Sequence, residues 1–113
     1  MSESLEFALV ARVREVLKGA PATEVELRRL AEESDAWCRA LAGQIEASET
    51  RLRKLAADAE SSLAPIAEEL RRLERLRPEL SELRARTEEL RTRAREFSSS
   101  WLLAQASRPK QSR

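Results

Sequence analysis

Acidic side chains are the most obvious candidates for catalysis in this sequence, because a pair of carboxylates can supply a general acid and a general base. They gather at Glu32, Glu33 and Asp35, and again at Glu88 and Glu89, in both places among arginines. The chain has no histidine, so its single cysteine lacks the usual partner base of a catalytic thiol. Acidic clusters set among arginines are typical of solvated helix faces. We therefore predict that the chain is not an enzyme and has no catalytic residue.

Binding sites for small ligands are equally hard to find in the sequence. Only two of the 113 residues are glycine, so no glycine-rich loop can cradle a phosphate group. The spacing that cysteine and histidine ligands adopt around a metal ion is absent as well. We expect no cofactor and no metal ion.

The segment from residue 82 to residue 96 is rich in arginine but is not a basic surface. Its glutamates are interspersed among its arginines, and the net charge of the whole chain is only +1. A protein that binds nucleic acid through its electrostatic field normally carries a large excess of positive charge. We therefore do not expect nucleic acid as the partner. The charged residues of this segment are Glu82, Arg84, Arg86, Glu88, Glu89, Arg91, Arg93, Arg95 and Glu96.

The composition predicts helices throughout. Charged residues make up 36% of the chain and aromatic residues only 4%, and alanine, leucine, glutamate and arginine dominate. Together with leucines that recur about every 3.5 residues, this is typical of a coiled coil. The predicted fold class is an all-α, elongated coiled coil, with a short N-terminal helix and a long helix that is kinked or folded back near Pro65.

The N-terminal part divides into a helix and a linker. Residues 1–18 have a broad apolar face, and Gly19 offers a left-handed stop after them. Phe7 lies off that face, so this segment is predicted to be a docking helix. Residues 19–22 form the linker. The next helix starts with a capping box, in which Thr23 and Glu26 each bind the backbone N–H of the other.

Residues 23–104 form the predicted coiled-coil region. Steps of three and four residues alternate along it almost throughout, as in the core positions of a heptad repeat. The seam consists of Leu27, Leu30, Ser34, Trp37, Leu41, Ile45, Ser48, Leu52, Leu55, Ala59, Leu63, Ile66, Leu70, Leu73, Leu76, Leu80, Leu83, Thr87, Leu90, Ala94, Phe97, Trp101 and Ala104.

Two prolines coincide with irregular steps in this seam, and breaks are predicted near both Pro65 and Pro78. At Pro65 the chain either continues as a kinked helix or folds back into a hairpin of two arms, 23–62 and 65–104. Because the seam stays apolar across Pro65 and no glycine is present to turn, the sequence favours the kinked helix. Residues 105–113 are predicted to be a basic, disordered tail.

Bulky apolar residues outside a simple seam indicate contact with other proteins. Trp37 falls on the seam, where it is either a bulky residue of the chain's own core, as is usual, or an anchor for a partner helix. At the other end, Phe97 and Trp101 continue the seam while Leu102 and Leu103 point elsewhere, so a partner is expected to cover them. The predicted partner-binding residues are Phe7, Trp37, Phe97, Trp101, Leu102 and Leu103.

Several small or polar residues in the seam make a self-sufficient homodimer a poor prediction and favour a hetero-oligomer with other helical, coiled-coil proteins. In size and periodicity the chain looks like the short helical subunits of kinetochore, centrosomal, dynactin-type or BLOC-type complexes. The expected function is that of a structural subunit in a cytoskeleton-associated complex of this kind. A vesicle-trafficking or organelle-positioning adaptor (BLOC-like or SNARE-like) is the first alternative, and a nuclear adaptor that contacts nucleic acid is the second.

A single cysteine, Cys38, excludes an internal disulfide and suits a reducing compartment. The sequence also lacks an apolar run long enough for a transmembrane helix and a leader typical of secretion. The expected localisation is cytoplasmic, with the cytoskeleton or the nucleus as alternatives.

Overall fold

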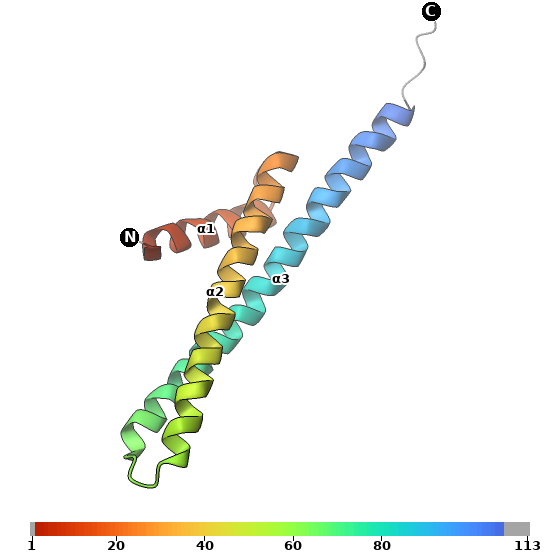
Figure 1. The fold of residues 1–113 in the computed structure, drawn as a ribbon. Helices are drawn as coiled ribbons and strands as arrows, with labels where there is room; N and C mark the ends of the chain where they lie inside the picture. The colour runs from red at the N-terminus through yellow and green to blue at the C-terminus, as the bar shows by residue number, and fades with distance from the viewer. Residues whose placement is uncertain (1, 108–113) are drawn as a thin grey trace, which may run out of the picture. The chain divides into compact units, whose positions relative to one another are not determined.

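The computed structural model describes the backbone of residues 2–107 and the side chains of residues 7–107. These residues form helices α1 (Ser2–Leu17), α2 (Glu24–Ala57) and α3 (Leu63–Ser107), with no strand among them (Figure 1). The predicted all-α fold is confirmed. The described residues group into two compact units. Residues 2–33 and 86–107 are called the three-helix unit, and residues 34–85 are called the hairpin unit.

Helix α1 ends as the sequence predicts. Gly19 adopts a left-handed backbone with φ of 112°, which suits a residue without a Cβ atom. The N–H of Ala20 donates to the carbonyl of Glu15 at 3.0 Å, and the N–H of Gly19 donates to that of Val16 at 3.0 Å. These two bonds form a Schellman motif, which satisfies carbonyls that the helix end would otherwise leave open.

Helix α2 begins with half of the predicted capping box. The Thr23 hydroxyl accepts a hydrogen bond of 3.0 Å from the N–H of Glu26. The Glu26 carboxylate, however, binds Arg12 of α1 through two hydrogen bonds of 2.9 and 2.7 Å. A bidentate bond to a guanidinium is stronger than one bond to a backbone N–H, so the expected return contact to Thr23 is replaced.

The chain folds back within the hairpin unit, and the continuous kinked helix that the sequence favoured is not formed (Figure 1). Helix α2 ends at Ala57, and the Asp58 side chain accepts a hydrogen bond of 3.0 Å from the N–H of Glu60. The Asp58 carbonyl accepts another, of 3.1 Å, from the N–H of Ser61. An aspartate-based turn therefore takes the place of the missing glycine. Pro65 is the third residue of α3, where its lack of an N–H costs no helical hydrogen bond.

The second predicted break, at Pro78, is absent because α3 continues through this residue. An interior proline removes a backbone hydrogen bond and costs about 3 kcal/mol. Leu76 and Leu80, on either side of Pro78, are both buried in the core of the hairpin unit. Burial of one leucine side chain contributes about 1.5–3 kcal/mol, so packing offsets the cost of the proline.

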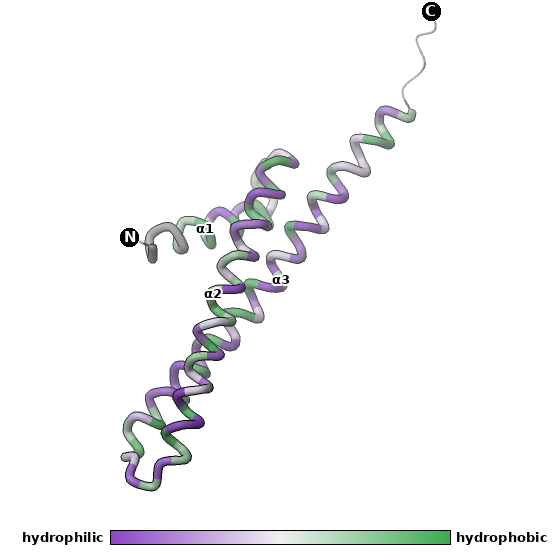
Figure 2. Tube along the Cα trace, in the orientation of Figure 1, coloured by the Kyte–Doolittle hydropathy of each residue, from purple (hydrophilic) through white to green (hydrophobic). Residues whose placement is uncertain are grey.

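The core of the hairpin unit consists mainly of predicted seam residues, but the seam residues Leu63 and Leu70 are 80% and 47% exposed and lie outside it. Figure 2 shows short hydrophobic segments that alternate with hydrophilic ones along α2 and α3. Ser48, fully buried on α2, donates a hydrogen bond to Glu69 of α3, and Arg51 donates a second one to the same carboxylate at 2.9 Å. Ser48, Arg51 and Glu69 therefore help to fix how the two arms align. The apolar core comprises Cys38, Leu41, Leu76, Leu80 and Leu83, with Trp37, Ala42 and Ile45 packed against it.

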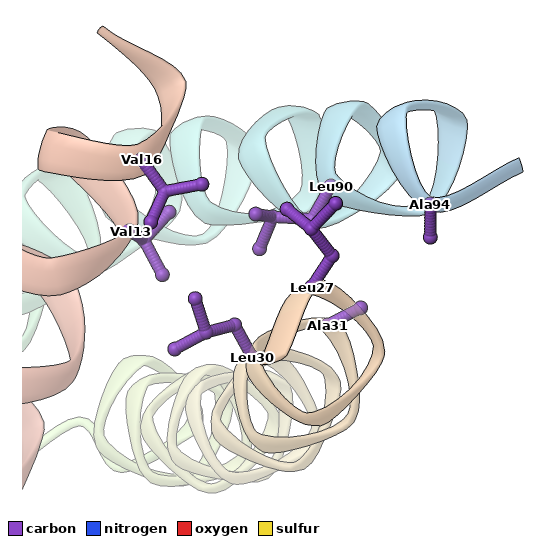
Figure 3. Packing of buried hydrophobic residues seen from close by; sticks show 7 residues of the cluster. All are labelled: Val13, Val16, Leu27, Leu30, Ala31, Leu90 and Ala94. Carbon is purple, nitrogen blue, oxygen red and sulfur yellow. The ribbon is translucent and has the colours of Figure 1, made fainter. Parts of the chain in front are cut away.

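The core of the three-helix unit draws on all three helices. Figure 3 shows side chains from α1, α2 and α3 that meet at one centre. Val13 and Leu90 are fully buried there, and Leu30 is 2% exposed. The apolar face predicted for the N-terminal helix therefore packs within the chain. The cluster consists of Val13, Val16, Leu27, Leu30, Ala31, Leu90 and Ala94.

The C-terminal end of the structure differs from the predicted disordered tail at its first residues. Helix α3 continues to Ser107, so residues 105–107 are helical. The remaining tail residues, 108–113, lie outside the described residues. Within the described part of the chain, none of the helices combines the length and the apolarity that crossing a bilayer requires.

Candidate partner-docking site

An apolar groove lies within the three-helix unit, at the end of its core. Its volume is about 510 Å³ and it is open on one side. The end of α1, the linker and the start of α2 form one wall, and α3 forms the other. The lining residues are Val16, Gly19, Ala20, Ala22, Leu27, Arg93, Glu96, Phe97, Ser100 and Trp101.

Helix α3 extends past the start of α2 beside this groove. Ser98 donates a hydrogen bond to the carboxylate of Glu24, which is the first residue of α2. Helix α3 continues for nine residues after this contact, to Ser107, or about 13 Å at 1.5 Å per residue. We call residues 97–107 the overhang. Because α2 begins at Glu24, it does not extend along the rest of the overhang. The seam residues of the overhang are therefore not covered by α2, as Leu90 and Ala94 are.

The large apolar side chains of the overhang are exposed. The exposed fraction is 44% for Phe97, 57% for Trp101, 60% for Leu102 and 67% for Leu103. Four large apolar residues so close together on one helix form a surface that water solvates poorly. The sequence placed all four in a partner-binding site, and the structure brings Phe97 and Trp101 to the groove with Leu102 and Leu103 beside them.

Arg93 organises the wall of the groove. Its guanidinium donates hydrogen bonds of 3.0 Å to the carbonyl of Val16 and 2.8 Å to the carbonyl of Leu17, and it also contacts Glu89 at 3.3 Å. A cation at the C-terminus of a helix also interacts favourably with the helix dipole. Arg93 therefore fixes the end of α1 against α3 and shapes the groove.

Two carboxylates hold the start of α2 in place. The hydrogen bond from Ser98, followed by the one from Arg28, lowers the pKa of Glu24 below its ordinary value. The hydrogen bond from Arg12, assisted by its charge, lowers the pKa of Glu26. Both carboxylates are therefore ionised at neutral pH and engaged in structural contacts within the chain.

The two other predicted partner-binding residues lie away from the groove. Phe7 of α1 is 78% exposed and does not line it. Trp37 belongs to the hairpin unit, where it is half-buried against the cluster that contains Cys38 and Leu41. The structure therefore places Trp37 in an internal contact and leaves Phe7 as a separate exposed residue.

Several residues of the groove had no signal in the sequence. Ala20 and Ala22 are small linker residues, and Arg93 is one arginine among many in its segment. The only hint was the linker itself, because a short connection forces the end of one helix and the start of the next to lie close together.

The described residues hold no group of three or more cysteine and acidic side chains that could bind a metal ion. The groove itself contains one carboxylate, Glu96, and one guanidinium, Arg93, among mostly apolar atoms. Such a lining is suited to receive an apolar side chain.

Comparisons of the chain with protein-family models, with curated proteins and with solved structures find no match.

Proposed function

We propose that this protein is a non-catalytic assembly subunit that binds helices of another protein through the overhang and the adjoining groove. The exposed cluster of Phe97, Trp101, Leu102 and Leu103 is the observation that carries the proposal. Aromatic side chains in such clusters commonly dominate the energy of an interface. A groove lined by apolar atoms beside them offers a place for a side chain of the partner.

The class of complex is proposed from the size and composition of the chain. A small helical protein with polar residues in its seam resembles, in size and periodicity, the short subunits of cytoskeleton-associated complexes of the kinetochore, centrosome or dynactin type. We extend the proposal to that class and to a hetero-oligomeric, cytoplasmic assembly. Phe7, exposed on α1, is a candidate for a second contact with the same assembly.

The test is affinity purification of the tagged full-length chain from cells that express it, with identification of the bound proteins by mass spectrometry. The informative variant combines Trp101→Ala with Leu102→Ala. Truncation of such anchors typically costs about 2 kcal/mol or more, or roughly thirtyfold in affinity. Leu63→Ala is the matched control, because Leu63 is 80% exposed and belongs to the hairpin unit.

We expect helical proteins to bind the wild-type chain and the Leu63 variant, and to be lost from the double variant. The helical circular dichroism of the double variant should match that of the wild type. If the double variant retains every partner, the overhang is not a docking site. Cytoskeletal partners would support the leading class, whereas trafficking proteins or salt-sensitive retention of nucleic acid would contradict it.

A further inference from the structure

The overhang differs from the rest of α3 in charge. Residues 63–96 of this helix contain 17 charged residues among 34, whereas the 11 residues of the overhang contain none. A helix that stays in water normally keeps charged residues on its solvated face. Every residue of the overhang except Ser98 is nevertheless exposed. Its lack of charge is therefore typical of a buried helix, although the three-helix unit half-buries only Ser98 among these residues.

The apolar residues of the overhang also surround the helix. Successive residues of an α-helix point about 100° apart, so Trp101, Leu102 and Leu103 point in three different directions. Phe97 and Ala104 lie on the same side as Trp101 and continue the seam that α2 buries at Leu90 and Ala94. A single packed helix covers a stripe roughly 100° wide, which is enough for the seam but not for Leu102 and Leu103 as well.

We propose that the partner encloses the overhang with two helices, so that residues 97–107 become one member of a three-helix arrangement. This inference rests on the proposed function and adds the number and chemistry of the partner's helices. One partner helix continues the place of α2 along the seam and inserts a large aliphatic side chain into the groove beside Phe97 and Trp101. The second covers Leu102 and Leu103. Both present apolar, uncharged inner faces.

Two other occupants fit the overhang less well. A second copy of the chain, paired by two-fold symmetry, would add one overhang to the other and leave a face of each uncovered. A membrane surface would need a helix with one strongly polar face, and the overhang has no charged residue on any face.

The test measures how fast a cysteine in the overhang reacts with maleimide-polyethylene glycol in the full-length chain. Ala104→Cys reports the seam side, and Ser99→Cys and Ala106→Cys report the opposite side. Each is made with Cys38→Ala, so that one thiol remains. Ala64→Cys is the matched control, because Ala64 is an exposed α3 alanine in the hairpin unit. Rates are compared between the purified chain and the complex isolated from cells through a terminal tag.

In the complex we expect the three overhang cysteines to react roughly tenfold or more slowly than in the purified chain, because an enclosed interface excludes water and reagent. The rate of Ala64→Cys should be the same in both. Protection at Ala104 alone would overturn the two-helix arrangement but leave the proposed function standing. Rates in the complex that equal those of the purified chain at all three positions would overturn both. Protection that is already present in the purified chain, without any other protein, would show a second copy as the occupant. Protection by phosphatidylcholine–phosphatidylserine vesicles would show a membrane, and either result contradicts the inference.

Discussion

The guanidinium of Arg93 on α3 lies 2.8 Å from the carbonyl oxygen of Leu17, the last residue of α1. It contacts the Val16 carbonyl as well, so one side chain closes the C-terminal end of α1. This contact joins two segments that are 76 residues apart in the sequence. The wall of the groove therefore depends on an arginine that also belongs to the surface of α3.

We predict that Arg93→Met loosens α1 from the three-helix unit. Hydrogen bonds from a charged donor to carbonyls contribute about 1.5–3 kcal/mol when buried, and half-exposed Arg93 should contribute about 1 kcal/mol. Hydrogen exchange should become faster at the amides of residues 7–17. The matched control is Arg95→Met, because Arg95 is exposed and contacts Thr92 and Glu88 of its own helix. Equal effects of the two variants would contradict a specific role for Arg93.

We predict a loss of stability in acid. Hydrogen bonds from Ser98, Arg12 and Ser48, respectively, lower the pKa of Glu24, Glu26 and Glu69 below the ordinary value of 4.5. The unfolded chain therefore binds protons more readily than the folded chain in this range. The stabilisation is fully present above pH 4.5 and is lost as the pH falls through the lowered values in the folded chain.

Urea denaturation followed by circular dichroism, from neutral pH down to about pH 3, measures this loss. Glu69→Gln should be less stable than the wild type at neutral pH and should show a weaker dependence on pH. Glu79→Gln is the control, because Glu79 is exposed on the same helix. A free energy of unfolding that is independent of pH in the wild type would contradict the assignment.

Much of the seam could be predicted from the sequence, because burial repeats with the period of the helix, but the exposure of Leu63 and Leu70 near the turn could not. Leu41, Leu73 and Leu90 are seam residues and are at most 1% exposed. The turn could not be predicted in the same way, since it depends on hydrogen bonds that the side chain and the carbonyl of Asp58 accept. The groove could not be predicted for a related reason. Arg93 is one of several arginines in its segment, and only the fold brings it to the end of α1.

The leucines of the seam should contribute to the free energy of unfolding according to how deeply each is buried. Leu41 is 1% exposed in the core of the hairpin unit, whereas Leu63 at the start of α3 is 80% exposed. Leu41→Ala should lower the free energy of unfolding by about 2–5 kcal/mol, because it leaves a cavity. Leu63→Ala should change it by less than about 0.5 kcal/mol. Denaturant titrations of the two variants measure the difference, and similar losses would show that the hairpin unit does not pack as described.

The two prolines of α3 should respond in opposite ways to replacement by alanine. Pro78 lies inside the helix, where its ring removes one backbone hydrogen bond, so Pro78→Ala should stabilise the chain by about 1–3 kcal/mol. Pro65 is in the first turn, where no hydrogen bond is missing, so Pro65→Ala should leave stability nearly unchanged. Thermal and urea denaturation of each variant measure the effect, with sedimentation to check that the oligomeric state is the same. A continuous helix across Pro65 would gain a hydrogen bond from its replacement. Stabilisation by Pro65→Ala as large as that by Pro78→Ala would therefore contradict the turn at Asp58.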